Sequence, residues 1–191
     1  MSIKDLIYML PGKYILKVAD SRPDLVNWNA LSNEVELPES FIERHKNRID
    51  WKVISKTQVL SEPFIEKHKD KVDWENIFEY QKLSEPFIEK YHYKVDPEII
   101  LKHQKLSTSF IERNKDWIDW EAISKYQKLP EEFIEEYADK IDWMLVSIKQ
   151  PLSEEFIERH ANKVNWEGIF KYQTLSKEFI EKHKDKINKN N

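Results

Sequence analysis

The sequence predicts an all-α protein, an α-solenoid of seven short helix-turn-helix repeats of 23 residues each with a helical cap at the N-terminus. Two observations predict this fold. Phe-Ile pairs, tryptophans, leucines and glutamines all recur at one 23-residue step without an insertion. Within one step, the apolar residues have helical spacing. A fixed step of this kind is typical of arrays in which each repeat buries its apolar face against the next.

The recurring residues form columns that share one register. The Phe-Ile pairs run from Phe41-Ile42 to Phe179-Ile180, and the leucines from Leu37 to Leu175. The tryptophan column holds Trp28, Trp51, Trp74, Trp120, Trp143 and Trp166, with Pro97 in the one vacant position. The glutamine column holds Gln58, Gln81, Gln104, Gln127, Gln150 and Gln173. We interpret the tryptophans as core residues at the junctions between repeats, because six indoles at one position indicate packing.

Residues 60–82 show how one repeat is built. Ser61 is typical of a helix N-cap, and Pro63 would lie in the first turn, where its missing N–H costs nothing. This predicts a first helix of about ten residues, too short to persist alone. Asp73 then caps a second helix of about eight residues, in which Trp74 and Ile77 lie on one face.

The first helix of each repeat needs a stop, and the whole chain has only two glycines. The corresponding column is mostly Asn or Asp, the non-glycine residues that best tolerate the left-handed conformation. We therefore expect left-handed helix ends in this column. Its members are Asn47, Asp70, Tyr93, Asp116, Asp139, Asn162 and Asp185.

Three segments follow from the repeat. Residues 1–36 are predicted to be an N-terminal cap with a degenerate repeat, residues 37–187 one solenoid of tandem repeats, and residues 188–191 a frayed tail. Inside the cap, we expect a first helix with an apolar stripe, ended by Pro11-Gly12. The stripe consists of Ile3, Leu6, Ile7 and Leu10.

Composition excludes several functions. The formal net charge is −4, which argues against a dedicated polyanion binder, and the absence of cysteine removes disulfides and thiolate chemistry. Two glycines cannot form a phosphate-binding loop. No constellation of catalytic residues stands out, so we expect a non-enzymatic protein without a cofactor. No apolar run is long enough to span a bilayer, and we expect a soluble, cytoplasmic protein with no membrane contact. The oligomeric state is not indicated.

The histidines suggest a metal site only weakly. His45, His68, His160 and His183 share one column with Tyr91, Asn114 and Tyr137. Metal ligands must converge within a few ångströms, whereas neighbouring helices lie about 8–10 Å apart. We therefore expect these histidines to lie at the edge of the core, without a metal.

The glutamine column has two interpretations. A ring beside an amide and a lysine, once per repeat, is how helical repeat proteins read single-stranded RNA. The residues concerned are Tyr80, Gln81, Lys82, His103, Gln104, Lys105, Tyr126, Gln127 and Lys128. Alternatively, the amides bond the backbone of the adjacent repeat and form a ladder. We favour the ladder, because an invariant glutamine encodes no base sequence and the net charge is negative.

Departures from the repeat offer a candidate protein-binding patch. The sequence Tyr91-His92-Tyr93 is followed by Pro97 in the tryptophan column, and Trp117 stands where other repeats carry Lys or Arg. Exposed aromatic side chains are typical of binding hot spots. We predict a contact patch of Tyr91, His92, Tyr93 and Trp117. Neutral drift is the alternative, and Pro97 is compatible with the first position of a helix.

The consensus L-S-E-x-F-I-E-x-x-x-D-K-V-D-W-x-x-I-S-x-x-Q-x over residues 37–187 resembles short tandem helical repeats of large DNA viruses and bacteriophages. The resemblance implies a viral or phage factor that engages or inhibits a host protein. Our hypothesis from the sequence is therefore a repeat scaffold that binds a protein partner. Single-stranded nucleic-acid binding is the alternative.

Overall fold

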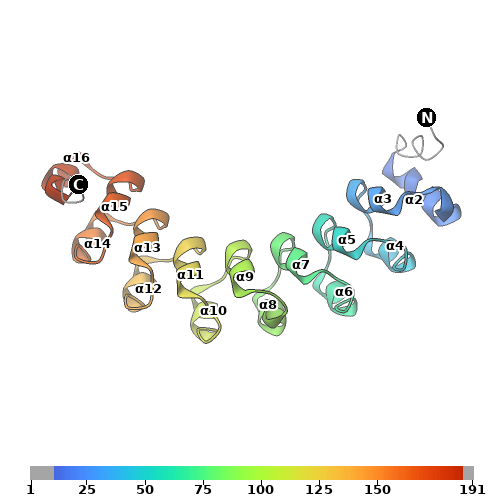
Figure 1. Ribbon diagram of the computed structural model, residues 1–191, viewed down its shortest axis with the longest axis horizontal. Helices are drawn as coiled ribbons and strands as arrows, with labels where there is room; N and C mark the ends of the chain where they lie inside the picture. The colour runs from blue at the N-terminus through green and yellow to red at the C-terminus, as the bar shows by residue number, and fades with distance from the viewer. Residues whose placement is uncertain (1–10, 187–191) are drawn as a thin grey trace. The chain divides into compact units, whose positions relative to one another are not determined.

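The computed structural model describes residues 11–186 and is helical throughout that range, with no strand. Its helices group into two compact units, residues 1–95 and residues 96–191. Each unit is a stack of helical hairpins, so the predicted all-α repeat fold is confirmed (Figure 1).

Unit 1 contains three hairpins behind a longer first helix. Its elements are α2 (Gly12–Ser21), η1 (Pro23–Leu25), α3 (Trp28–Glu34), α4 (Glu39–Arg44), α5 (Trp51–Thr57), α6 (Glu62–Lys67), α7 (Trp74–Tyr80), α8 (Glu85–Tyr91) and η2 (His92–Lys94). In Figure 1, α3, α5 and α7 form one layer and α4, α6 and α8 form the other. We call the layer of α3, α5 and α7 the second-helix layer, because it holds the second helix of each repeat.

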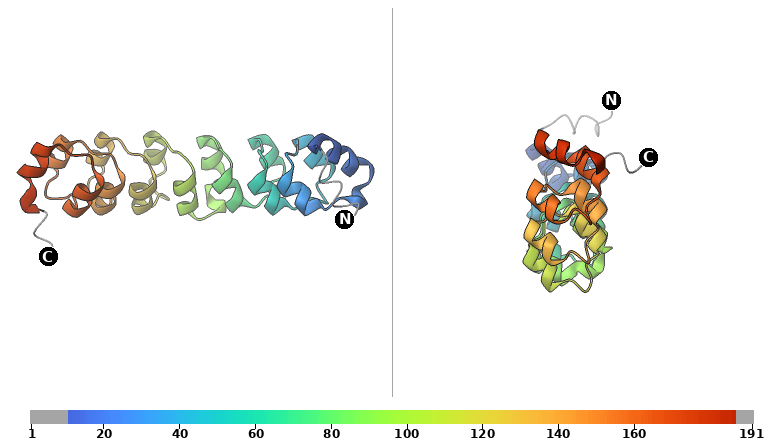
Figure 2. Two further views of the ribbon diagram at one scale, coloured as in Figure 1. Left: turned by 90° about the horizontal axis from the view of Figure 1, so that it is seen from above. Right: turned by 90° about the vertical axis from the view of Figure 1, so that its left-hand side faces the viewer.

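Unit 2 repeats the same plan. Its elements are α9 (Pro97–His103), α10 (Thr108–Arg113), α11 (Trp120–Tyr126), α12 (Glu131–Glu136), α13 (Trp143–Lys149), α14 (Glu154–Arg159), α15 (Trp166–Tyr172) and α16 (Lys177–Lys182). Its second-helix layer consists of α9, α11, α13 and α15, and each of these helices packs on the next. Figure 2 shows from above how the hairpins of each unit follow one another.

The predicted helix starts are confirmed. In α6, Ser61 Oγ accepts a hydrogen bond from the Phe64 N–H at 3.4 Å, and Pro63 lies in the first turn. In α7, Asp73 accepts from the Asn76 N–H at 3.0 Å. These bonds satisfy amides that the first helical turn leaves without a partner. Pro97 occupies the first turn of α9, as its fixed φ allows.

The predicted left-handed helix ends are wrong. In the described part of the chain, no residue has a positive φ. The first helix ends earlier than expected, after six or seven residues, and the chain leaves it through a tight right-handed turn. After α6, His68 has φ −112° and ψ 23°, and its carbonyl accepts from Lys71 N–H at 2.8 Å and from Val72 N–H at 3.1 Å. One hydrogen bond of the 3₁₀ type and one of the α type therefore close the turn without a left-handed residue.

The N-terminal cap differs in one detail. Pro11-Gly12 begins α2, with Pro11 as its N-cap, whereas the sequence suggested that this pair ends a helix. The expected apolar stripe of residues 3–10 lies outside the described residues. Helix α2 occupies the place of a first helix, buries Ile15 and Ala19, and is followed by α3, so the degenerate repeat is present.

The glutamine column forms the predicted ladder. Gln150 is 2% exposed, and its Oε1 accepts from the Leu129 N–H at 3.0 Å. Its Nε2 donates to Ser124 O at 3.1 Å and to Gln127 O at 2.7 Å. Gln58, Gln81, Gln127 and Gln173 make the same three bonds to the repeat before them. One amide thus satisfies three backbone groups between two repeats.

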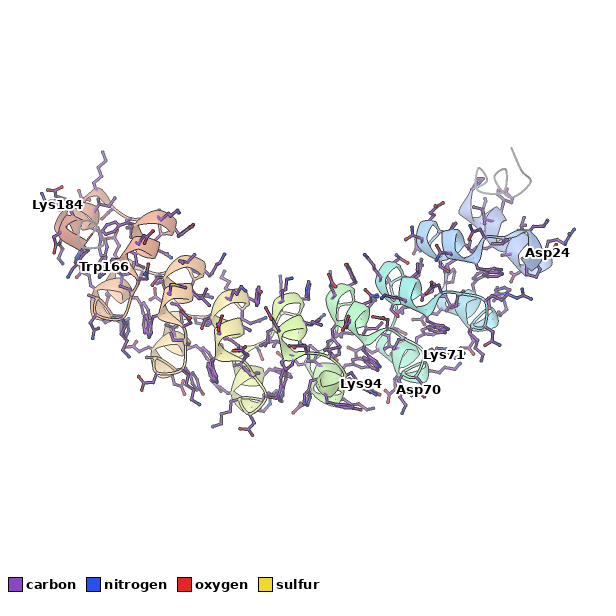
Figure 3. The ribbon with its side chains drawn as sticks, viewed as in Figure 1. Asp24, Asp70, Lys71, Lys94, Trp166 and Lys184 are labelled. Atoms are coloured by element: carbon purple, nitrogen blue, oxygen red, sulfur yellow. The ribbon has the colours of Figure 1, made fainter. Side chains whose placement is uncertain are left out.

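The tryptophan column lies at the junctions between repeats, as predicted. The Trp143 ring stacks on Phe156 at 6.1 Å and packs at a tilt against His160 at 5.0 Å, both from the next repeat. Its Nε1 donates to Ala138 O at 2.8 Å, and Lys163 Nζ lies 5.6 Å from the ring centroid. In unit 1, Lys71 covers Trp51 in the same way and lies at the turn after α6 (Figure 3).

A carboxylate–serine contact also joins successive repeats. The Glu131 carboxylate accepts from both the N–H and the hydroxyl of Ser153, which is the N-cap of the next first helix. The same contact joins Glu39 to the Ser61 N–H, and joins Glu62 to Ser84 and Glu154 to Ser176 through both groups. Where the serine is replaced by Pro38 or Pro130, the glutamate position holds Leu16 or Thr108. Proline has no N–H to donate, so both partners of the contact are absent together.

Gln150→Leu is expected to destabilise unit 2 strongly. The leucine keeps the side-chain size but leaves one buried N–H and two buried carbonyls without partners, at a cost of about 3 kcal/mol in the free energy of unfolding. Urea denaturation followed by tryptophan fluorescence measures this cost. The exposed Glu155→Ala is the control and should change stability by less than about 0.5 kcal/mol. A similar small effect for Gln150→Leu would contradict the ladder's role.

The double substitution Thr108→Glu with Pro130→Ser is expected to restore the missing carboxylate–serine contact. Neither single variant can form it, so the double variant should be more stable than the two single effects predict, by about 1 kcal/mol. A double-mutant cycle of urea denaturation curves measures this coupling. Strictly additive effects would show that the contact contributes nothing between these repeats.

Candidate functional site

The structure buries one member of the predicted contact patch. Tyr91 is 4% exposed, because its ring stacks on Trp74 at 4.8 Å and on Phe87 at 4.8 Å. The expectation of an exposed aromatic is therefore wrong for Tyr91, which fills the position that histidine takes in other repeats. His92 is half-buried and Tyr93 is 66% exposed, and both lie in η2 at the end of unit 1.

Trp117 belongs to unit 2 and is half-buried there. Its Nε1 donates to Asn114 Oδ1 at 3.0 Å, and its ring meets Phe110 edge-on at 6.3 Å. Asn114 therefore contacts the indole of Trp117, which lies in the same turn. In most other repeats the residue at the Asn114 position contacts the tryptophan of the preceding repeat, where this chain has Pro97. These contacts give Trp117 a packing role, and its part in a contact patch stays a prediction.

The residues that could bind nucleic acid differ in exposure and in hydrogen bonding. The amides of Gln81 and Gln127 are occupied in the ladder, and Gln104 is 6% exposed. Tyr80 is 44% exposed beneath Lys56, and Tyr126 Oη donates to Glu98 at 3.0 Å. His103 is half-buried, and Lys82, Lys105 and Lys128 are exposed. The lysines are exposed in both units, the ring is exposed at Tyr80 and half-buried at His103 and Tyr126, and the amides of Gln81 and Gln127 are engaged with the backbone.

The histidine column pairs with carboxylates of the preceding repeat. His68 Nε2 lies 2.7 Å from Glu43 Oε2, and His45 Nε2 lies 2.8 Å from Asp20 Oδ1. Lys46 and Lys67, together with His68, lower the pKa of Glu43 to about 2. Among residues 11–186, no three His, Asp or Glu side chains are grouped so that they could hold a metal ion.

His160 is the exception in this column. Its Nε2 is buried and lies 3.8 Å from Glu135 Oε1, too far for a hydrogen bond, while Arg159 holds the same carboxylate at 2.9 Å. Burial beneath Trp143 lowers the pKa of His160 below its usual value. The neutral imidazole is therefore the form that the fold favours here.

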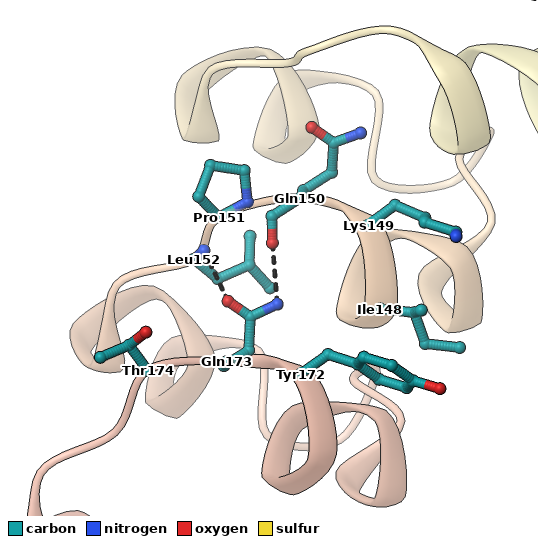
Figure 4. A pocket seen from close by; sticks show the side chains of 8 residues that line it. All are labelled: Ile148, Lys149, Gln150, Pro151, Leu152, Tyr172, Gln173 and Thr174. Atoms are coloured by element: carbon teal, nitrogen blue, oxygen red, sulfur yellow. Dashed lines mark hydrogen bonds between the residues drawn. The ribbon is translucent and has the colours of Figure 1, made fainter.

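A pocket on unit 2 is the strongest candidate site, and the sequence analysis missed it. It has a volume of about 320 Å³ and lies between the ends of α13 and α15 (Figure 4). The residues that line it are Ile148, Lys149, Gln150, Pro151, Leu152, Tyr172, Gln173 and Thr174. Its floor is rigid, because Gln173 bonds Leu152 N–H and Gln150 O across it. Tyr172, whose side chain is 54% exposed, lies beside Ile148 at one end (Figure 4).

Local departures from the repeat make this region apolar. Met144 is 53% exposed where the other repeats from α5 to α15 carry Lys or Glu, and Ile148 replaces the lysine or glutamate found there in those helices. Gly168 lets α15 approach closely, since a Cβ at this position would lie 2.9 Å from Ile148 Cγ1. We name Met144, Ile148, Lys149, Pro151 and Tyr172 the α13–α15 surface.

A simple signal could have revealed this surface. In the repeat of residues 129–151 the core columns are intact, and the changes fall at positions where the other repeats carry charged side chains. Two apolar residues four apart, Met144 and Ile148, lie on one helical face. Exposed aromatic and methionine side chains are enriched at protein interfaces.

No protein-family model, curated protein or solved structure matches this chain. Among the described residues, no helix combines the length and apolar character that crossing a bilayer requires. The function must therefore be argued from the site itself.

His160→Tyr is expected to change how stability depends on pH. The folded state lowers the pKa of His160, so the unfolded state takes up more protons as the pH falls. The stabilisation is complete above the unfolded pKa of about 6.5 and is lost as the pH falls below it. Relative to the tyrosine variant, the wild-type free energy of unfolding should fall between about pH 7.5 and pH 5. Parallel pH profiles in urea denaturation would contradict this account.

Proposed function

We propose that this protein is a non-enzymatic repeat scaffold that binds a protein partner, and that the α13–α15 surface is a contact site. The support is that most recurring polar and aromatic side chains are engaged in structural contacts. Glutamine amides, aspartate and serine caps and the tryptophan indoles form contacts within and between repeats. The residues left for recognition are those that differ between repeats on exposed positions.

The observation that carries the proposal is the exposure of two large side chains, Met144 on α13 and Tyr172, which itself lines the pocket. Exposed tyrosines beside apolar side chains, such as Tyr172 and Met144, are typical of interface hot spots. A pocket held in place by backbone hydrogen bonds costs little ordering entropy when a ligand enters. The resemblance to viral and phage repeats extends the proposal to a factor that engages or inhibits a host protein.

Selection from a phage-displayed random peptide library against the intact chain tests this proposal. Recovered peptides should bind the variants Met144→Glu and Tyr172→Ala at least about tenfold more weakly than wild type, because each variant removes apolar contact area. Fluorescence anisotropy with the synthetic peptides measures the affinities.

Glu121→Ala is the matched control, because Glu121 takes on α11 the place that Met144 takes on α13. Peptides selected on wild type should bind this control with unchanged affinity. Failure to recover any peptide, or equal binding to all variants, would count against a protein-binding role for the α13–α15 surface.

A further inference from the structure

The α13–α15 surface carries positive charge at its edge. Lys149 lines the pocket, and Lys171 Nζ lies 5.3 Å from the centroid of the Tyr172 ring. A second hollow of about 510 Å³ shares Pro151 with the pocket and is lined by Lys128. Lys149 therefore lines the pocket, Lys171 lies beside its Tyr172 wall, and Lys128 lines the neighbouring hollow. The pocket has a mixed lining, in which Ile148, Pro151 and Tyr172 offer apolar surface.

Negative charge is absent from the pocket lining but present around it. None of the eight residues that line the pocket is acidic. In the neighbouring hollow, the Glu131 carboxylate is bonded to Ser153, which leaves Glu132 as the acid nearest to Lys128 along its wall. Glu167 lies near the start of α15, one turn before Lys171 and on the same face of the helix, so it is the acid closest to Lys171 along α15.

The end of α13 contributes little free negative charge to the pocket. The C-terminus of a helix carries partial negative charge on its last carbonyls. At the end of α13, Gln173 Nε2 donates to Ser147 O at 2.9 Å and to Gln150 O at 2.8 Å. Two of these carbonyls are thus already bonded to a donor, and Lys149 in the last turn offsets the rest.

The tyrosine at this site differs from its counterpart two repeats earlier. Tyr126 Oη donates to Glu98, which lies 28 residues before it. The residue 28 positions before Tyr172 is Met144, which has no carboxylate to accept that bond. A ligand carboxylate would supply the acceptor that this repeat lacks.

These contacts define what fits the site. We propose that the α13–α15 surface binds an acidic peptide segment with a bulky apolar side chain, which enters the pocket while flanking carboxylates meet Lys149, Lys171 and the Tyr172 hydroxyl. This inference rests on the proposed protein-binding function and names the chemistry of the partner. Lys149 and Lys171 are complementary to such a segment in charge, and Ile148, Pro151 and Tyr172 offer apolar contact to its bulky side chain.

Three fluorescein-labelled peptides test this inference by anisotropy with the full chain. The first carries a Phe-Leu pair flanked by Asp and Glu, the second flanks the same pair with Asn and Gln, and the third keeps the acids but replaces the pair with Ala-Ala. The first should bind at least about tenfold more tightly than either of the others, because it alone supplies both charge and apolar area. Its affinity should fall as salt is raised.

Charge-reversed variants locate the binding. Lys149→Glu with Lys171→Glu should weaken the acidic Phe-Leu peptide about tenfold or more, whereas Lys115→Glu, an exposed lysine at the turn after α10, should leave its affinity unchanged. Circular dichroism spectra verify that each variant is folded. Binding of the acidic peptide that is indifferent to the lysine pair would overturn the inference.

Other outcomes separate this inference from the proposed function. Library peptides that bind the α13–α15 surface but are neutral and insensitive to salt would leave the protein-binding function standing and overturn the acidic ligand. Tight, salt-sensitive binding of a single-stranded oligonucleotide at the same lysines would overturn both. Sedimentation that shows a dimer lost in Met144→Glu would assign the surface to a second copy of this chain and overturn the inference.

Discussion

The structure depends on one hydrogen-bonded amide per repeat. The second helices are only seven residues long, and such helices are unstable alone. Each must be held against its neighbour, and the connecting backbone between repeats must be satisfied although it lies in neither a helix nor a sheet. A buried glutamine does both, because its oxygen accepts one N–H and its nitrogen donates to two carbonyls of the preceding repeat. At the junctions that carry the tryptophan, aromatic packing covers the opposite side, as Trp143 does with Phe156 and His160.

The sequence predicted those features of the fold that recur. The helix starts at Ser61 and Asp73, the tryptophan junctions and the glutamine ladder each follow from a column in which one chemical requirement repeats. The left-handed helix ends were predicted from the same kind of column but are wrong. An Asn or Asp at that position is also compatible with the tight right-handed turn that follows His68, and composition alone does not distinguish the two.

The candidate site was harder to predict, because departures from a repeat have two physical origins. Tyr91 departs from histidine yet keeps its packing on Trp74, so it is a substitution within the core. Met144 departs at an exposed position, and the half-buried Ile148 at a position that is an exposed lysine or glutamate in the other repeats from α5 to α15. Distinguishing these cases requires the burial of each position, which the sequence columns do not state. The pocket itself also depends on the close approach at Gly168, which is a property of two helices together.

The carboxylate–serine contact has a consequence for how such an array grows. In a complete repeat, the glutamate accepts from the serine of the repeat after it, and the serine donates to the glutamate of the repeat before it. Each contact therefore needs residues from two successive repeats. Duplication of residues 60–82 would copy a glutamate and a serine together, and every new junction would be complete. Duplication of residues 106–128 would instead copy Thr108 in place of the glutamate. Each new junction would then lack the carboxylate of the carboxylate–serine contact. The repeat that is duplicated thus determines how many junctions of a longer array contain the carboxylate–serine contact.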